Sequence, residues 1–186
     1  MVEVVCPPCD ITGEEMPEQR NMMIEAARIS RGAIQEIRSV QPVDIDALVI
    51  PGGFGSAKNF SSWAFDGANA FILPEVKLLI VNLLNVGKPI VALCVSPVVL
   101  ALAMKDVAMS LNLSLGTTKE KSPYDIASFH DGILLTGSTT EEKTIKEILI
   151  DYDNKIICAP CYMMEASMLD VRLNIQAALL ALKELV

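Results

Sequence analysis

The chain has 186 residues, a length typical of one domain with a substantial core. Of these residues, 52% are hydrophobic but only 5% are aromatic, which predicts an aliphatic core such as that of a parallel sheet covered by helices. The formal net charge of −8 argues against nucleic acid or an anionic membrane as a partner. No uninterrupted apolar run is long enough to span a bilayer.

The five cysteines are an odd number, and the first residues lack the basic and apolar pattern of a signal peptide. We therefore expect reduced thiols in an intracellular compartment. The expected location is the cytoplasm, or the mitochondrion if a preceding segment carries a transit peptide.

Strand and helix patterns alternate along the chain, with proline and glycine at their ends. Strands are predicted over 2–6, 46–50, 88–91, 111–115 and 156–159, and helices over 22–29, 75–86, 97–104 and 165–185. This alternation predicts one domain over 1–186 with an α/β, doubly wound, flavodoxin-like fold, in which helices cover both faces of a mostly parallel sheet.

The pattern is weaker between residues 106 and 150. Residues 133–135 fit either a strand or the end of a helix. Residues 141–150 have the composition of a helix, although Ile145 and Ile148 to Ile150 would also pack as a strand.

Cys94 is the leading candidate for a functional residue. It follows the apolar strand at 88–91 and precedes a helix that opens with Pro97, and α/β enzymes place a nucleophile at such a sharp strand-to-helix turn. The free N–H groups and partial positive charge of a helix N-terminus favour thiolate over thiol. The alternative is that Cys94 is a small buried core residue, which is common for free cysteine.

A glycine loop, Gly52-Gly53-Phe54-Gly55, follows the strand at 46–50. Because parallel strands present their carboxyl ends at one edge, we expect this loop and Cys94 to share a crevice. The backbone N–H groups of Gly53 and Val95 are then candidate donors to one oxyanion. Gly52, Gly55 and Asn59 are expected to support the loop, although the glycines alone also fit a simple tight turn.

Histidine is the usual base beside a nucleophilic cysteine, and this chain has one, His130. Nothing in its spacing brings it to Cys94, so we expect a surface histidine.

Two C-x-x-C pairs, Cys6/Cys9 and Cys158/Cys161, match the spacing of zinc ligands or redox pairs. Both pairs lie at predicted strand ends, and their prolines are explained more simply as strand terminators. We therefore expect no metal site and no cofactor.

Four segments together resemble one known family. They read R-N-M-M-I-E-A-A-R-I-S-R-G at 20–32, P-G-G-F-G-S-A-K-N-F at 51–60, G-K-P-I-V-A-L-C-V-S-P at 87–97 and N-K-I-I-C-A-P-C-Y-M at 154–163. They are similar to the ElbB-type family, also called ES-type or isoprenoid-biosynthesis glyoxalase-like proteins. This family belongs to the PfpI superfamily, which has a class I glutamine-amidotransferase-like fold.

The resemblance implies a catalytic Cys94 and an oxyanion pocket formed by Gly53 and Val95. It also implies a glutamate, from a first strand–helix unit, that hydrogen-bonds the thiolate. That motif is absent, and the chain begins at the family's second strand, so it is N-terminally truncated relative to the family. In a flavodoxin-like order the missing strand would lie between 2–6 and 46–50. Either these two strands pair directly, or a partner chain fills the gap, or the sequence is incomplete.

The resemblance further implies a cofactor-free glyoxalase acting on a small carbonyl substrate, a 2-oxoaldehyde. Because the glutamate is absent, weak or no activity is expected. The alternative is a non-catalytic binding protein of the same superfamily, or one that senses oxidants through Cys94. We also expect a homodimer with no nucleic-acid or membrane partner.

Overall fold

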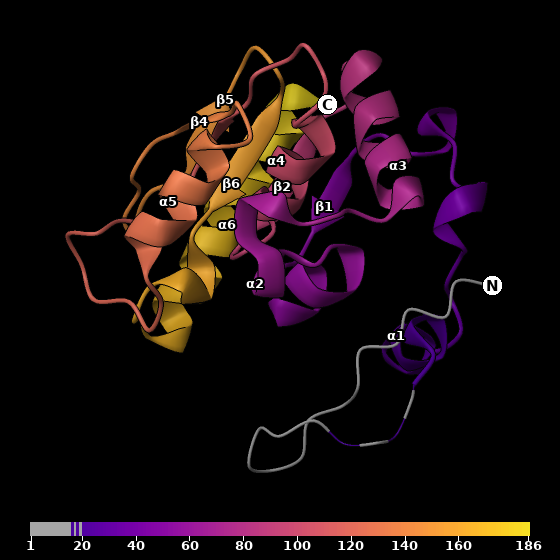
Figure 1. Cartoon of the computed structure of the whole chain (residues 1–186), viewed down its shortest axis with the longest axis horizontal. Coiled ribbons are helices and arrows are strands. Elements are labelled where there is room, and N and C mark those ends of the chain that lie inside the picture. Colours follow the sequence, from indigo (N-terminus) through magenta and orange to yellow (C-terminus); the bar gives the residue numbers. More distant parts are fainter. Residues whose placement is uncertain (1–15, 17, 19) are drawn as a thin grey trace. The chain divides into compact units, whose positions relative to one another are not determined.

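The computed structural model describes Met16, Glu18 and residues 20–186. The chain divides into two compact units, one ending at Val40 and the other running from Gln41 to Val186 (Figure 1). The strand predicted over 2–6, together with Cys6 and Cys9, lies outside the described residues. The single domain over 1–186 stays a prediction.

The first unit contains helix α1, Met22–Ser30, which lies where the sequence predicts a helix. The side chain of Asn21 accepts hydrogen bonds from the backbone N–H groups of Met23 and Ile24, at 3.0 and 3.1 Å. It thereby satisfies two of the donors that a helix start leaves without partners. The helix ends at Arg31, which has the left-handed φ of 53°.

A mostly parallel sheet forms the centre of the second unit. Its strands are β1 (Leu48–Ile50), β2 (Ile90–Leu93), β6 (Ile156–Ala159) and β5 (Leu149–Asp151), in that spatial order. The first three strands are parallel, and β5 pairs antiparallel with β6. Every residue of β2 and β6 is buried, as expected for strands covered on both faces. Among the described strands, β1 pairs with β2 alone.

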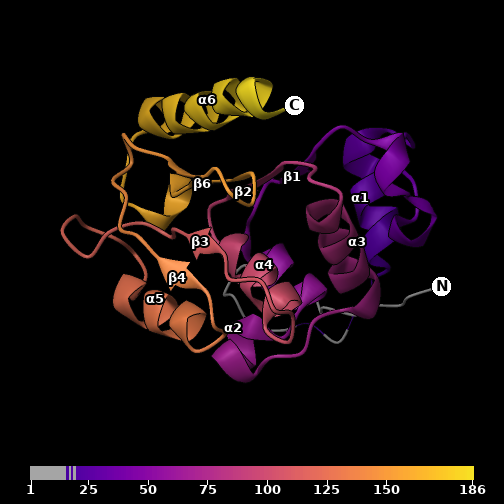
Figure 2. The same ribbon diagram turned by 90° about the horizontal axis from the view of Figure 1, so that it is seen from above.

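Helices lie on both sides of this sheet (Figure 2). Helix α6, Met168–Leu185, covers one face, and α3, α4 and α5 lie on the other. Their bounds are Pro74–Asn85, Pro97–Met104 and Ile126–Leu134. The α/β architecture predicted from the sequence is therefore confirmed. A short helix, α2, spans Trp63–Asp66.

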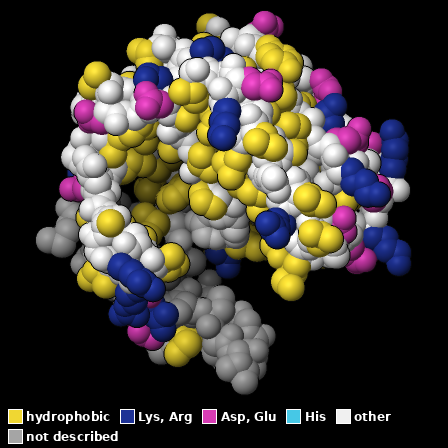
Figure 3. All heavy atoms as spheres, turned by 180° about the vertical axis from the view of Figure 1, so that it is seen from behind, with side chains coloured by type: hydrophobic (Ala, Val, Ile, Leu, Met, Phe, Trp, Pro, Cys, Tyr) yellow, Lys and Arg dark blue, Asp and Glu magenta, His cyan; other side chains and the backbone are white. Residues whose placement is uncertain are grey.

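The core has a layer on each face of the sheet. Helix α4 is apolar on all sides, and all eight of its residues are buried, as expected for a helix of this composition. On the other face, Val91, Leu93, Ile157 and Ala159 pack with Val171 and Ala178 of α6. The outer side of α6 exposes Leu169, Leu173 and Leu180, and Figure 3 shows hydrophobic side chains gathered on this face of the molecule. No helix in the described part of the chain is long and apolar enough to cross a bilayer.

Of the two alternatives for residues 141–150, the helix is not formed, and the strand forms in part as β5. The segment forms a turn and then β5, because its polar side chains bond to nearby backbone instead of continuing a helix. The Glu147 carboxylate accepts from the backbone N–H of Thr144 at 2.9 Å. Residues 133–135 include the end of α5, and the strand predicted over 111–115 shortens to β3, Asn112–Leu113, which pairs with β4, Thr139–Thr140.

Glu142 fixes the loop that follows β3. Its carboxylate accepts from the Thr117 hydroxyl at 3.0 Å, from the Thr118 hydroxyl, and from the Thr118 backbone N–H at 3.1 Å. The two hydrogen bonds from Thr118 are the main reason that the pKa of this carboxyl falls from 4.5 to about 2. The charged form of Glu142 therefore stabilises the folded chain.

We predict that Glu142→Gln destabilises the protein at pH 7 by about 1 kcal/mol, a value reduced by solvent screening of this partly exposed group. Because the pKa of Glu142 is lowered on folding, its contribution is complete above pH 4.5 and is lost as the pH falls toward 2. Urea unfolding across this range measures the difference between variant and wild type, which should shrink with falling pH. Glu120→Gln, on the same loop and exposed, is the control. A difference that stays constant with pH would contradict the prediction.

Candidate functional site

Cys94 lies in a sharp turn between β2 and α4, where the sequence places it. Its φ of 57° is in the left-handed region, which residues other than glycine rarely adopt. The backbone N–H of Cys94 donates to the carbonyl of Ala159 on the neighbouring strand at 2.9 Å, so the turn is tied to the sheet. The side chain is half-buried, and the Cys94 thiol is free. Its role as a nucleophile stays a prediction.

The glycine loop packs directly against this turn. Gly52 and Gly53 have φ values of 89° and 79°. A Cβ atom on Gly52 would lie 2.5 Å from the carbonyl oxygen of Leu93 and 2.8 Å from the Cβ of Cys94, whereas one on Gly53 would meet nothing within 4 Å. Only glycine therefore fits at position 52 without displacing the cysteine turn.

A buried hydrogen bond joins the segment after Cys94 to the strand that precedes the glycine loop. The Ser96 side chain, which is fully buried, donates to the carbonyl of Ile50 at 3.1 Å. Ile50 is the last residue of β1, and Ser96 lies two residues after Cys94. The two strand ends are thus joined by a hydrogen bond as well as by their parallel pairing, and the glycine loop and Cys94 share one edge of the sheet as predicted.

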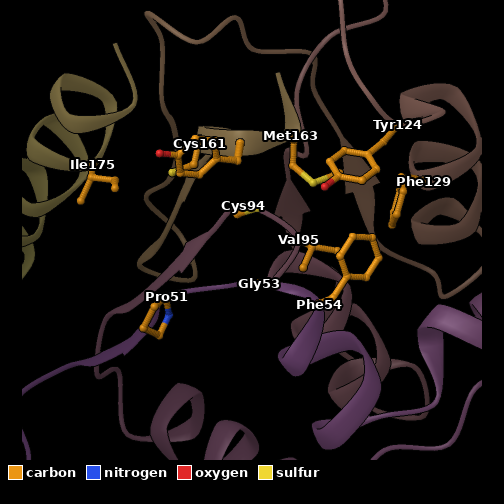
Figure 4. Close-up of a pocket in the computed structure, with 11 residues that line it drawn as sticks. Pro51, Gly53, Phe54, Cys94, Val95, Tyr124, Phe129, Cys161, Met163 and Ile175 are labelled. Carbon is orange, nitrogen blue, oxygen red and sulfur yellow. The ribbon is translucent and has the colours of Figure 1, made fainter. Parts of the chain in front are cut away.

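A cavity of about 230 Å³ opens beside Cys94 (Figure 4). Gly53 and Val95 both line it, so the two predicted oxyanion donors lie at the same cavity as the sulfur. Their function as donors stays a prediction. The other lining residues are mainly apolar or aromatic: Pro51, Phe54, Tyr124, Phe129, Cys161, Tyr162, Met163 and Ile175. Phe54 and Tyr124 form an edge-to-face pair with ring centroids 5.6 Å apart, which closes one end of the cavity.

Cys161 is a site residue that the sequence reasoning missed. It follows β6, has a left-handed φ of 50° and is 3% exposed. The Asn174 side chain of α6 accepts from the backbone N–H of Cys161 at 2.9 Å and holds this turn in place. Burial is the main cause that raises the pKa of the Cys161 thiol to about 12. The sequence does carry a signal for Cys161. It lies two residues after the predicted strand at 156–159, and the carboxyl ends of parallel strands meet at one edge of the sheet, where Cys94 and the glycine loop also lie.

The C-x-x-C spacing matches a zinc or redox pair of Cys158 with Cys161, but the structure separates the two side chains. Residues alternate across a strand, and Ile157 and Ala159 face α6, so Cys158 points to the opposite face of the sheet. Its thiol is fully buried beside the backbone N–H of Ser114, and burial raises its pKa to about 12. The two cysteines of this pair therefore do not converge. Among the residues that the structure describes, no group of three His, Cys, Asp or Glu side chains is placed to hold a metal ion.

The surface position predicted for His130 is wrong. The side chain lies in α5 and is only 8% exposed, and its Nε2 lies 3.3 Å from the carbonyl oxygen of Gly116. The prediction failed because the amphipathic α5 was not recognised from the sequence. His130 does not line the cavity, although the preceding residue, Phe129, does.

Gly55 and Asn59 lie behind the cavity wall rather than on it. Gly55 precedes a π-helix, Ser56–Phe60, which contains Asn59. A Cβ on Gly55 would lie 3.5 Å from the side-chain nitrogen of Asn59, so the two residues are neighbours. The Asn59 side-chain oxygen is buried and has no hydrogen-bond partner among the described residues. The support that these residues give the glycine loop stays a prediction.

Comparison with known proteins places this arrangement in a family. No family model matches the chain. The crystal structure of an isoprenoid biosynthesis protein with an amidotransferase-like domain, from Ehrlichia chaffeensis, superposes with a TM-score of 0.82 at 32% identity, covering 97% of this chain and 79% of that one. The chain belongs to the glutamine amidotransferase-like, ElbB-type family. The predicted resemblance is thereby confirmed.

Two mitochondrial relatives agree with this family. The human glutamine amidotransferase-like class 1 domain-containing protein 3 is 31% identical over 151 residues, and the rat ES1 protein homolog is 30% identical over 151 residues. Each alignment covers 81% of this chain. The chain spans slightly more than half of the length of these relatives, 55% and 56%.

Paired glycine substitutions test the packing of the loop against the cysteine turn. We predict that Gly52→Ala costs roughly 2–5 kcal/mol, from a left-handed alanine plus overpacking against Leu93 and Cys94. Gly53→Ala should cost roughly 1–2 kcal/mol, because only the backbone term applies. Urea unfolding measures both losses, and the alkylation rate of Cys94 by iodoacetamide should change only in Gly52→Ala. Equal losses of unfolding free energy in the two variants would show that the close approach at Gly52 does not contribute to stability.

Proposed function

We propose that this protein is a glyoxalase-like thiol protein whose Cys94 adds to the aldehyde carbon of a small 2-oxoaldehyde. The observation that carries the proposal is the left-handed Cys94 turn at the mouth of a cavity lined also by Gly53 and Val95. The Cys94 sulfur forms a bond to the aldehyde carbon, and the π electrons of the carbonyl move to its oxygen. Backbone N–H groups at Gly53 and Val95 would stabilise that oxygen until it gains a proton, which gives a hemithioacetal.

Conversion of this adduct to a 2-hydroxy acid needs a base. A proton must leave the hydroxyl-bearing carbon and return to the neighbouring carbon, and water must then release the thiol. No carboxylate or imidazole lines the cavity in the described part of the chain. A positioned base contributes roughly 10²–10⁴-fold to such a step, so we propose that carbonyl addition is rapid and reversible and that turnover is slow.

The alternative function is non-catalytic binding or oxidant sensing through the same thiol. The apolar cavity, whose described lining holds no carboxylate or imidazole, favours it, since the sulfur would then react with an oxidant that needs no proton shuttle. Selective oxygen addition at Cys94 under mild peroxide, with no turnover of 2-oxoaldehydes, would distinguish this alternative.

The relatives bear on the location. Both the human and the rat protein are named as mitochondrial. The sequence led us to expect the cytoplasm, with the mitochondrion as the alternative, and the names of these relatives lead us to propose the mitochondrion instead. The homodimer and the absence of nucleic-acid and membrane partners remain proposals that rest on the sequence.

The addition step is tested by protection of the thiol. We predict that methylglyoxal slows alkylation of Cys94 by iodoacetamide, and that dialysis restores the original rate. Lactate, followed by proton NMR, should form slowly with the wild type and not at all with Cys94→Ala.

Cys158→Ala is the matched control for this experiment, because Cys158 lies on the opposite face of β6 and outside the cavity. It should keep both the protection and the slow lactate formation. Lactate formation that survives Cys94→Ala in a folded variant would exclude Cys94 as the nucleophile. Absence of protection in the wild type would exclude carbonyl addition.

A further inference from the structure

Two cysteines that are distant in the sequence line the same cavity. Cys94 directly follows β2, and Cys161 comes shortly after β6. The two strands are parallel neighbours, with Leu93 opposite Ala159, so their ends deliver both cysteines to one edge of the sheet. Both cysteines line the cavity and are labelled in Figure 4.

The two residues also belong to one packed group. Cys94 packs against the apolar cluster that contains Cys161. Although burial is the larger cause, a negative charge on the Cys94 sulfur also raises the pKa of the Cys161 thiol. The two thiols therefore lie near each other beside the same cavity.

The backbone holds both cysteines in place. Each has a left-handed φ, 57° at Cys94 and 50° at Cys161, and such conformations persist only where the surroundings fix them. The Cys94 N–H is anchored to Ala159 and the Cys161 N–H to Asn174, each at 2.9 Å. A disulfide needs Cα atoms about 4.4–6.8 Å apart, and the pairing of Leu93 with Ala159 places the two cysteines just beyond adjacent positions of neighbouring strands.

The two thiols differ in their access to reagents. Cys94 is half-buried, whereas Cys161 is 3% exposed, and burial raises the pKa of the Cys161 thiol to about 12. An oxidant that enters the cavity therefore meets Cys94 as the accessible sulfur, while Cys161 stays protonated beside it. This is the arrangement of an attacking cysteine with a neighbouring resolving cysteine.

We propose that Cys94 and Cys161 form an intramolecular disulfide when the protein reacts with a peroxide. The Cys94 thiolate attacks one peroxide oxygen, the O–O bond breaks, and a sulfenic acid forms on Cys94 while the other oxygen leaves as hydroxide. The Cys161 sulfur then attacks the Cys94 sulfur, the S–O bond breaks, and that oxygen leaves as water with the Cys161 proton. Each disulfide thus consumes one hydrogen peroxide, oxidises two thiols and yields two waters.

This chemistry is separate from carbonyl addition, although both use Cys94. Once the disulfide forms, Cys94 no longer has a thiolate that can add to an aldehyde. A dithiol reductant restores it.

The test uses the full chain, reduced and then exposed to a small molar excess of hydrogen peroxide. After free thiols are blocked with N-ethylmaleimide, non-reducing peptide mass spectrometry should find the Cys94 peptide joined to the Cys161 peptide, with the loss of two hydrogen atoms. Dithiothreitol should separate them. The Cys161→Ala variant should lose this cross-link completely, and Cys94 should then advance to sulfinic acid.

Cys158→Ala is the control, and it also simplifies the assignment. Cys158 and Cys161 share the tryptic peptide between Lys155 and Arg172, so removing Cys158 leaves one cysteine in it. This variant should keep the cross-link in full. Cys161→Ser is a second variant in case Cys161→Ala does not fold. Near-ultraviolet circular dichroism of both variants and the wild type shows whether the fold is kept.

Two outcomes would overturn the proposal. One is a Cys161→Ala variant whose Cys94 oxidation products match those of the wild type. The other is a Cys94 cross-link to Cys6, Cys9 or Cys158 in place of Cys161. Because no aldehyde is present, either failure would leave carbonyl addition at Cys94 standing, and failure of that addition would leave the disulfide standing.

Discussion

The site depends on the close approach of the Gly52 backbone to the turn formed by Leu93 and Cys94. No Cβ fits between these segments, and the buried Ser96 hydroxyl joins the same turn to the end of β1. The ends of β1 and β2 are thereby held together. The Cys94 N–H also donates to the Ala159 carbonyl, which ties β6 to the same turn. The cavity and the left-handed Cys94 both follow from this packing, since neither would persist if the loop moved outward.

The chemistry of the cavity is set by what surrounds the sulfur. Aromatic and apolar side chains dominate the walls, and the polar side-chain groups among the lining residues are the tyrosines Tyr124 and Tyr162 and a second thiol, Cys161. Proton transfer in such a site needs a further group, and no carboxylate or imidazole lines the cavity in the part of the chain that the structure describes. The proposed chemistry at Cys94 is therefore one in which bonds to sulfur form and break reversibly.

The sequence predicted the parts of the site that depend on local patterns. The strands that precede the glycine loop and Cys94 could be found because their apolar runs are followed by glycine or by a helix that opens with Pro97. The errors concern residues whose state depends on distant partners. His130 is buried against the carbonyl of Gly116, and Cys161 reaches the cavity through strand pairing, so neither position could be read from its own segment.

Asn174 connects parts of the fold that no strand joins. Its side chain accepts from the Cys161 N–H and donates to the carbonyl of Glu147 at 2.8 Å, so one buried amide of α6 holds both the cavity and the segment before β5. Any sliding or rotation of α6 must therefore carry the Cys161 turn with it or break these bonds. A substitution at Asn174 would therefore disturb the cavity and the approach to β5 together, although the two are far apart in the sequence.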